Sequence, residues 1–197
     1  MPRAGLDTAA VTAAAAALAD EVGLGGLSMG LLAERLGVRT PSLYKHVANQ
    51  ADLLHRVAVL AAVELGDALR DATQGRAGTD ALEAAAQAMR AYVTQHPGRY
   101  AAGNAVPPTG PEDPLTVAVD RVLRSFSAVL RGYALPREQE THALRTVRST
   151  LHGFAVLEAE GGFRFATDVD ASFAWLVRLL DEGLRASGGT AGREGSS

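Results

Sequence analysis

The sequence predicts an all-α protein in which an N-terminal domain of three short helices, arranged as a helix-turn-helix, precedes a C-terminal helical bundle, with about nine helices in all. Three observations lead to this fold class. The 197 residues are 47% hydrophobic but only 5% aromatic, so the core must be built from leucine, valine and closely packed alanine-faced helices. Helix-capping residues stand ahead of segments whose apolar side chains recur at three- and four-residue steps. Glycine or proline follows most of those segments, where a helix must end.

Side-chain caps and glycine stops define the first two helices. Asp7 is the expected N-cap of a helix over residues 8–22, which a glycine ends, and the GLGGLS segment that follows is a loop. Ser28 is the expected N-cap of a second helix over residues 29–36, which ends at Gly37. The N-terminal domain thus begins with two short, capped helices.

Two further caps start the next pair of helices. Thr40 is a cap followed by Pro41 at the first helical position, where a missing N–H costs nothing, so a third short helix begins there. Asn49 and Asp52 form a capping-box pattern for a fourth, longer helix whose leucines and valines continue to about Leu69.

The remaining helices are predicted from apolar periodicity. They cover residues 80–96, 114–132, 136–160 and 168–187. Pro97 and Gly98 end the first of them, and four prolines make residues 104–114 a loop, because proline removes donors and forbids continued helix. Thr167 and Asp170 form a capping-box pattern at the start of the last helix.

The chain is expected to have three parts. Residues 1–50 form the helix-turn-helix domain, the fourth helix connects onward from about residue 50, and residues 51–187 form the C-terminal domain. The tail, residues 188–197, is too small and polar to pack and is expected to be disordered.

Composition excludes several classes of protein. The absence of cysteine excludes disulfides, thiolate metal sites and cysteine nucleophiles together. The longest apolar run, near residues 57–63, is far shorter than the roughly 20 residues of a membrane span, and the N-terminus has no basic-then-apolar signal pattern. We therefore expect a soluble cytoplasmic protein with no membrane partner.

Histidine spacing argues against a metal site. His142 and His152 lie ten residues apart on one predicted helix, about 15 Å by helical rise, so they do not share an ion within one chain. We expect neither a metal nor a cofactor, and we interpret His152 as a packing residue that can also border a pocket.

Charge gives only local support for a nucleic-acid partner. The formal net charge is −3, and within residues 1–50 four cations and four acids cancel. From Arg35 to His46, however, there are three cations and no acid, and one of these cations, Lys45, is the only lysine of the chain.

Residues 27–54 have the pattern of a helix-turn-helix. The buried stripe of its first helix consists of Leu27, Leu31, Leu32 and Leu36. Gly37 makes the turn, and Leu43 and Val47, one turn apart on the second helix, face inward. The side chains left to face outward are Thr40, Pro41, Ser42, Tyr44 and Lys45. Such a helix offers its first residues to base edges in the major groove and its N–H groups to phosphate.

The outward side chains divide by chemistry. The Tyr44 hydroxyl and the Lys45 ammonium suit phosphates, whereas Thr40 and Ser42 can reach bases. Arg39 can make a bidentate contact to guanine or equally bind the backbone, and His46 is ambiguous. The complete predicted DNA-binding set is Ser28, Arg39, Thr40, Pro41, Ser42, Tyr44, Lys45, His46 and Asn49. Two alternatives stay open: a three-helix cap without a nucleic-acid role, and a Tyr44 half-buried against Leu31.

Two segments resemble a known family. LSMGLLAERLGVRTPSLYKHVANQADLL resembles the DNA-binding domain of the TetR family of bacterial repressors. LHGFAVLEAEGGFRFATDVDASFAWLVRLLDEGL resembles the C-terminal domain of a TetR subgroup called WHG-type, with Leu151 where the tryptophan would stand. The resemblance implies an all-helical homodimer with two DNA-binding heads and a C-terminal core, here residues 51–187, that binds a small molecule and dimerises.

The chain departs from the family pattern at three positions. Met29 and Gly30 stand where the repressor that gives the family its name has a threonine and an arginine used for DNA. Gln50 replaces the lysine usual at the start of the fourth helix, which weakens one expected phosphate contact. Affinity then rests more on Arg39, Tyr44, Lys45 and helix N-termini.

The effector and dimer sites are predicted from the C-terminal helices. An apolar pocket is expected to involve Met89, Tyr92, Tyr100, Phe126 and His152, although these side chains could instead simply fill the core. The expected dimer interface consists of Ser149, Gly153, Phe173, Leu176, Val177, Leu180 and Leu184, although an intrachain core would produce a similar stripe.

The function that these patterns favour is a ligand-responsive transcriptional regulator, most simply a repressor, and not an enzyme. Its partners would be double-stranded DNA with a near-palindromic operator, a small apolar or amphipathic effector, and a second copy of the chain. The rival interpretation is a helical-bundle enzyme or small-molecule-binding protein with a vestigial DNA-binding head.

Overall fold

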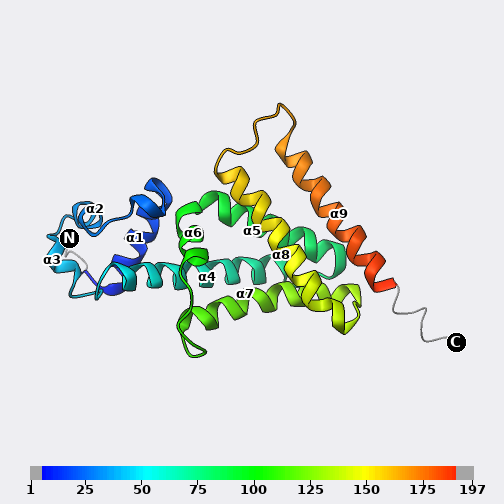
Figure 1. Ribbon diagram of the computed structural model, residues 1–197, viewed down its shortest axis with the longest axis horizontal. Coiled ribbons are helices and arrows are strands. Elements are labelled where there is room, and N and C mark those ends of the chain that lie inside the picture. Colours follow the sequence, from blue (N-terminus) through cyan, green and yellow to red (C-terminus); the bar gives the residue numbers. More distant parts are fainter. Residues whose placement is uncertain (1–5, 190–197) are drawn as a thin grey trace. The chain divides into compact units, whose positions relative to one another are not determined.

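The computed structural model describes residues 6–189, and within that range the chain forms nine α-helices and two 3₁₀ turns without any strand. The predicted all-α class is therefore confirmed (Figure 1). The described chain divides into two compact units, and the three divisions fall inside three of the helices, one of them at the last residue of its helix. The N-terminal unit holds residues 6–64 and 95–119, and the C-terminal unit holds residues 65–94 and 120–189.

The N-terminal unit begins with the helices that the sequence predicts. Its elements are α1 (Thr8–Val22), a 3₁₀ turn (Leu24–Gly26), α2 (Met29–Leu36), α3 (Thr40–Leu43), the first part of α4 (Gln50–Thr73), α6 (Pro97–Ala105) and the start of α7 (Pro114–Leu130). The Asp7 carboxylate accepts a hydrogen bond from the Ala10 N–H at 2.7 Å. The Ser28 hydroxyl accepts one from the Leu31 N–H at 3.2 Å. Both predicted caps are thus confirmed, and the expected loop after α1 contains one short 3₁₀ turn.

The start of α3 differs from the prediction by one residue. Arg39, with extended backbone, is the N-cap, and its carbonyl accepts the first turn's hydrogen bond from the Ser42 N–H at 2.8 Å. Thr40 is therefore the first helical residue rather than the cap, and Pro41 follows it. Among residues 6–189, no side chain makes a capping hydrogen bond to the start of this helix. It is also short, ending at Leu43, so Tyr44 to His46 form a turn.

The predicted cap of α4 is confirmed. Asn49 Oδ1 accepts from the Asp52 N–H at 2.9 Å, and Asp52 Oδ2 accepts from the Ala48 N–H at 2.8 Å. The return bond thus reaches one residue further back than in the usual capping box. The helix continues to Thr73, one turn beyond the predicted end.

The helix α6 was not predicted. Proline at its first position lacks only an N–H that would have no helical partner, so the Pro97-Gly98 pair starts a helix where it was expected only to end one. Gly98 lies against α1: a Cβ at this position would stand 1.9 Å from the Ala19 carbonyl oxygen. The close approach of α6 to α1 therefore requires glycine.

An ion cluster fixes the same contact. The Arg99 N–H and Nε donate to the two carboxylate oxygens of Asp20 on α1, at 2.9 and 2.8 Å. The Arg99 guanidinium also donates to Glu64 on α4 at 2.9 Å, and His96 Nδ1 lies 3.3 Å from Asp20 Oδ2. One arginine thus ties α6 to both α1 and α4.

A buried carboxylate organises the loop between α6 and α7. Asp113, 8% exposed, accepts from the Thr109 N–H at 2.7 Å, the Thr109 hydroxyl at 2.8 Å and the Leu115 N–H at 2.8 Å. The Nε2 of His55 on α4 lies 2.8 Å from its Oδ1. The hydrogen bonds from the Thr109 and Leu115 backbone hold the pKa of Asp113 well below its usual range. The predicted proline-rich loop is therefore ordered around one ionised side chain.

The C-terminal unit is a bundle of longer helices. Besides the remaining parts of α4 and α7 it contains α5 (Gly78–Gln95), a 3₁₀ turn (Arg131–Tyr133), α8 (Arg137–Ala159) and α9 (Val169–Gly189). At the start of α9 the Asp168 carboxylate accepts from the Asp170 N–H at 2.9 Å, so Asp168 replaces the predicted Thr167 as the capping side chain. Of the predicted disordered tail, 188 and 189 are the last turn of α9, and 190–197 lie outside the described residues.

Arg90 ties three helices of this unit together. From α5 its guanidinium donates to both oxygens of Glu158 on α8, at 2.5 and 2.6 Å, and to Asp170 on α9 at 2.7 Å. Its charged end also lies over the Phe173 ring, 4.7 Å from the centroid. The hydrogen bonds to Glu158 raise the pKa of Arg90 above its usual value, so it stays charged.

Among residues 6–189, no helix combines the length and the apolar character that crossing a membrane requires.

Candidate nucleic-acid interface

The turn after α3 is anchored by two buried side chains. Leu43 is fully buried and Val47 is 2% exposed, and both belong to the core formed with Leu32 and the helices α1 and α4. Burying each such side chain contributes about 1.5–3 kcal/mol, so the residues between them are held in one orientation. The predicted inward pair is thus where the sequence places it. Leu31, predicted to be buried, is instead exposed.

Most of the predicted DNA-binding side chains lie at the surface. The exposed ones are Ser28, Arg39, Pro41, Tyr44, Lys45 and Asn49. The half-buried ones are Thr40, Ser42 and His46. Tyr44 is 51% exposed and does not belong to the core, so about half of its surface reaches solvent. The structure therefore gathers an aromatic hydroxyl, an ammonium and a guanidinium around the short helix α3.

The cations near α3 are not equivalent. Arg35 donates to both carboxylate oxygens of Glu21 on α1, at 2.5 and 2.7 Å, so its charge is already neutralised. Within the described residues neither Arg39 nor Lys45 forms an ion pair, which leaves two of the three predicted cations to meet phosphate. The local positive charge is therefore smaller than the sequence suggests, and it is concentrated at α3 and the turn that follows.

Two contacts that sequence reasoning missed hold this region in place. The Thr8 hydroxyl on α1 donates to the His46 carbonyl oxygen at 3.2 Å, which fixes the turn against α1. Gln50 Nε2 donates to the Leu27 carbonyl oxygen at 3.0 Å. Gln50 stands where the family usually has a lysine, and its side chain links the start of α4 to the segment before α2. No local sequence signal indicates a bond that joins residues 23 or 38 positions apart.

The residues predicted to bind an effector are mostly buried. Met89, Tyr92 and Phe126 are 1%, 7% and 1% exposed in the C-terminal unit, and His152 there is half-buried. Tyr100 is 8% exposed and belongs to the N-terminal unit. Their burial is what a core-filling role requires.

The residues predicted at the dimer interface separate into two groups. Phe173, Val177 and Leu184 are buried within their own chain, as in the alternative of an intrachain core. Ser149 is exposed, and Gly153, Leu176 and Leu180 are partly exposed. Three large apolar side chains that were not predicted are exposed on α8 and α9, namely Leu157, Trp175 and Leu179 at 50%, 59% and 51%.

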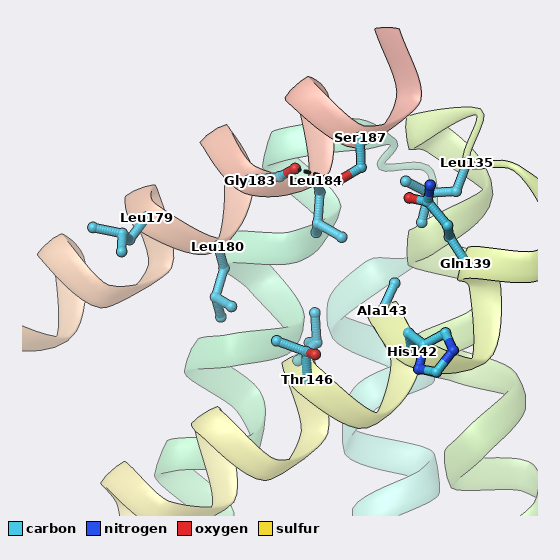
Figure 2. Close-up of a pocket in the computed structure, with 11 residues that line it drawn as sticks. Leu135, Gln139, His142, Ala143, Thr146, Leu179, Leu180, Gly183, Leu184 and Ser187 are labelled. Atoms are coloured by element: carbon cyan, nitrogen blue, oxygen red, sulfur yellow. Dashed lines mark hydrogen bonds between the residues drawn. The ribbon is translucent and has the colours of Figure 1, made fainter. Parts of the chain in front are cut away.

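A groove separates the first half of α8 from the second half of α9. Figure 2 shows Leu180 and Leu184 on α9 pointing across it toward Ala143 and Thr146 on α8, and Leu179, Gly183 and His142 also line it. Its volume is about 430 Å³ and its lining is mainly apolar. The exposed apolar side chains and this groove therefore occur on the same two helices.

An all-helical chain whose N-terminal unit presents a helix-turn-helix, with cations and a tyrosine around its second helix, is of the class of DNA-binding transcriptional regulators. Comparison with known proteins agrees. Residues 11–57 match the family described as bacterial regulatory proteins, tetR family. Residues 82–180 match the tetracyclin repressor-like C-terminal domain.

Whole-chain relatives give the same result. The chain is 36% identical over 175 residues to the HTH-type transcriptional regulator Rv0681 of Mycobacterium tuberculosis, covering 87% of this chain and 80% of the relative. It is 33% identical over 186 residues to the HTH-type transcriptional regulator YobS of Bacillus subtilis, covering 93% and 95%. The chain therefore belongs to the TetR family, and the predicted class of DNA-binding transcriptional regulator is confirmed.

Solved structures share the fold. BioQ of Mycobacterium smegmatis matches with a TM-score of 0.70 and 26% identity over 93% of this chain and all of that one. BioQ solved with its natural double-stranded DNA operator matches with a TM-score of 0.68 and 25% identity, over 92% and 99% of the two chains.

Proposed function

We propose that the protein is a homodimeric repressor that binds a near-palindromic operator and is released from it by a small-molecule effector. Residues 1–50 serve as the operator-binding domain, and residues 51–187 bind the effector and dimerise. The observation that carries this proposal is the exposed set Arg39, Tyr44 and Lys45, held beside the buried anchors of α3. Two such heads would enter successive major grooves about 34 Å apart.

Within the operator-binding domain the residues have different roles. Lys45 binds phosphate as a point charge, and the Tyr44 hydroxyl donates to a phosphate oxygen. Arg39 reads a guanine edge or binds the backbone, while Thr40 and Ser42 approach bases. Ser28, Pro41, His46 and Asn49 complete the surface. BioQ, a relative in fold with an operator complex, supports this use of the domain.

For the effector, we propose that Met89, Tyr92, Phe126 and His152 of the C-terminal unit enclose an apolar ligand, while a role for Tyr100 of the N-terminal unit stays a sequence-based prediction. Such a ligand would favour a spacing of the two heads that no longer fits the operator, which needs only a few kcal/mol of differential affinity. The relatives are named as transcriptional regulators, and we assign the chain no catalytic role. The expected location is the cytoplasm, with association to the nucleoid when operator is bound.

For the dimer, we propose that the exposed faces of α8 and α9 pair across a two-fold axis. The contact surface includes Ser149, Gly153, Leu176 and Leu180 from the sequence-based prediction. Trp175, Leu179 and Leu157 extend it, because large apolar side chains exposed together mark interaction surfaces.

Operator binding is tested by gel shift with DNA flanking the gene of this protein, followed by anisotropy titrations over a series of salt concentrations. Lys45→Ala should weaken binding to all sequences similarly and flatten the slope of log K against log salt by about one unit, because one phosphate contact is lost. Tyr44→Phe should cost about 1 kcal/mol, roughly fivefold, because one hydrogen bond is lost.

Arg131→Ala is the matched control, since Arg131 is an exposed cation in the 3₁₀ turn after α7. It should leave both affinity and salt slope unchanged. An unchanged slope in Lys45→Ala would remove Lys45 from the interface. If the wild-type protein binds no specific sequence at moderate salt, the repressor proposal fails and the rival, a small-molecule-binding bundle with a vestigial head, takes its place.

A further inference from the structure

A second groove of the C-terminal unit lies between α5 and α9, beside the end of α4. Its volume is about 700 Å³, and small-molecule sites commonly have volumes of roughly 300–1,000 Å³. None of the residues proposed to enclose the effector lines it. It is therefore a separate concavity of the described chain.

Small side chains make the room for this groove. Ala84 and Ala88 lie one turn apart on α5, Ala174 faces them from α9, and Ala72 comes from the last turns of α4. Val177, 5% exposed, closes the floor. Where three helices meet with alanine at each contact, the space that larger side chains would fill stays open. The resulting floor is apolar.

Two arginine side chains lie at the rim of this groove. Arg76, just after α4, and Arg178 on α9 both line the groove and are exposed. Among the described residues neither guanidinium has an ion-pair partner, whereas Arg70, Arg90 and Arg185 of the same unit all have one. Both arginines therefore retain their full capacity to bind an anion.

The other polar groups at the rim do not cancel this charge. Glu83 and Gln87 on α5 also line the groove. Two arginines against one glutamate leave a formal charge of +2 − 1 = +1. An arginine guanidinium is planar and binds carboxylate or sulfonate oxygens through two parallel hydrogen bonds, which gives the site its chemical selectivity.

We propose that this groove binds a small amphipathic anion. The planar apolar body of the ligand lies on the alanine floor, and its carboxylate or sulfonate is held by Arg76 and Arg178. This site goes beyond the proposed function, because it is distinct from both the operator-binding surface and the residues assigned to the effector. The regulator would then have a second ligand-binding site, which is selective for amphipathic anions.

The test uses the purified full-length protein and two fluorescent probes. 8-Anilinonaphthalene-1-sulfonate is an aromatic anion, and N-phenyl-1-naphthylamine is its neutral counterpart without the sulfonate. Arg76→Gln and Arg178→Gln should each raise the Kd of the anionic probe at least about tenfold, because a charge-assisted hydrogen bond is lost. They should change the Kd of the neutral probe less than twofold, as expected if only the anion is recognised.

Two further variants complete the design. Arg131→Gln removes an exposed cation outside the groove and should leave both probes unaffected. Ala88→Leu fills the floor and should displace the anionic probe, with circular dichroism confirming that the helices are intact.

The proposal is overturned if both arginine variants bind the anionic probe as the wild type does. It is equally overturned if they change the oligomeric state instead, since the groove would then be a contact between chains. Probe binding is measured without DNA, so a failure to bind operator leaves this result standing, and the reverse also holds.

Discussion

At the scale of the residue, the partner of a charged or polar side chain decides what that side chain can do. The sequence shows three cations between Arg35 and His46 without an acid, but it does not show that Glu21 lies opposite Arg35 on a neighbouring helix. Likewise, the sequence does not show that the Gln50 side chain donates a hydrogen bond to the Leu27 carbonyl, 23 positions earlier in the chain. Residue types could be assigned to DNA binding from spacing. Their pairing could not, because it depends on how α1 and α2 pack.

The buried carboxylate of Asp113 should leave a signature in the pH dependence of stability. Its pKa is lower in the folded chain than in the unfolded chain, so the stability it contributes is present above the usual aspartate pKa of about 3.9 and is lost as pH falls below it. Asp113→Asn should therefore lower Tm at pH 7 and reduce the drop in Tm between about pH 5 and pH 3. Thermal melts across this range test it.

Asp120→Asn is the control for this prediction. Asp120 is exposed on α7, and its one ion-pair partner within the described part of the chain is Arg124 at 3.8 Å, so its replacement should preserve the wild-type curve. Parallel Tm-versus-pH curves for Asp113→Asn and wild type would show that the ionised carboxylate does not stabilise the loop.

At the scale of the element, capping residues predicted where a helix starts better than they predicted whether a segment is a helix at all. Asp7, Ser28 and Asn49 were identified correctly because each N-cap acts within three residues of itself. The helix α6 was missed because Pro97-Gly98 is ambiguous: the same pair can end one helix or begin the next. What resolves the ambiguity is the packing of Gly98 against Ala19, a contact between segments 79 positions apart, which no local pattern contains.

Two glycines of α6 should therefore respond oppositely to alanine. A Cβ at position 98 would meet the Ala19 carbonyl oxygen at 1.9 Å, so Gly98→Ala must push α6 away from α1 and should cost about 1–3 kcal/mol of unfolding free energy. At Gly103 the nearest atom to an added Cβ is 3.7 Å away, an ordinary contact. Gly103→Ala should be neutral or stabilise by up to about 1 kcal/mol through helix propensity.

Urea unfolding of the two variants, followed by circular dichroism, measures this difference. Equal midpoints for Gly98→Ala and Gly103→Ala would mean that α6 is not held against α1 in solution.

At the scale of the whole molecule, the apolar stripe of α9 serves two purposes. Phe173, Val177 and Leu184 are buried within the chain, whereas Trp175 and Leu179 on the same helix are more than half exposed. The three- and four-residue spacing predicted that the helix has a buried face. It could not separate burial within a chain from burial between chains, because both require the same side chains at the same spacing.

The proposed pairing of α8 and α9 is tested at Gly153. A Cβ added there meets nothing within 4 Å in the single chain, so a side chain can start from this position without a clash, whereas a phenyl ring on the proposed contact surface would obstruct a partner. Gly153→Phe should raise the dimer Kd at least about tenfold, equivalent to 1.4 kcal/mol, while Gly153→Ala should remain dimeric. Light scattering after size-exclusion chromatography measures both. A fully dimeric Gly153→Phe variant at low concentration would place the interface elsewhere.

The isolation of Lys45 has a consequence for the chemistry of the chain as a whole. It carries the only side-chain amine in the sequence, and it lies exposed in the turn after α3. Any reagent or enzyme that acylates lysine can therefore act on this protein at one side chain only, and in doing so it removes a positive charge. A fluorophore attached by amine chemistry at a pH that spares the α-amino group would report on that turn alone, without a single engineered substitution.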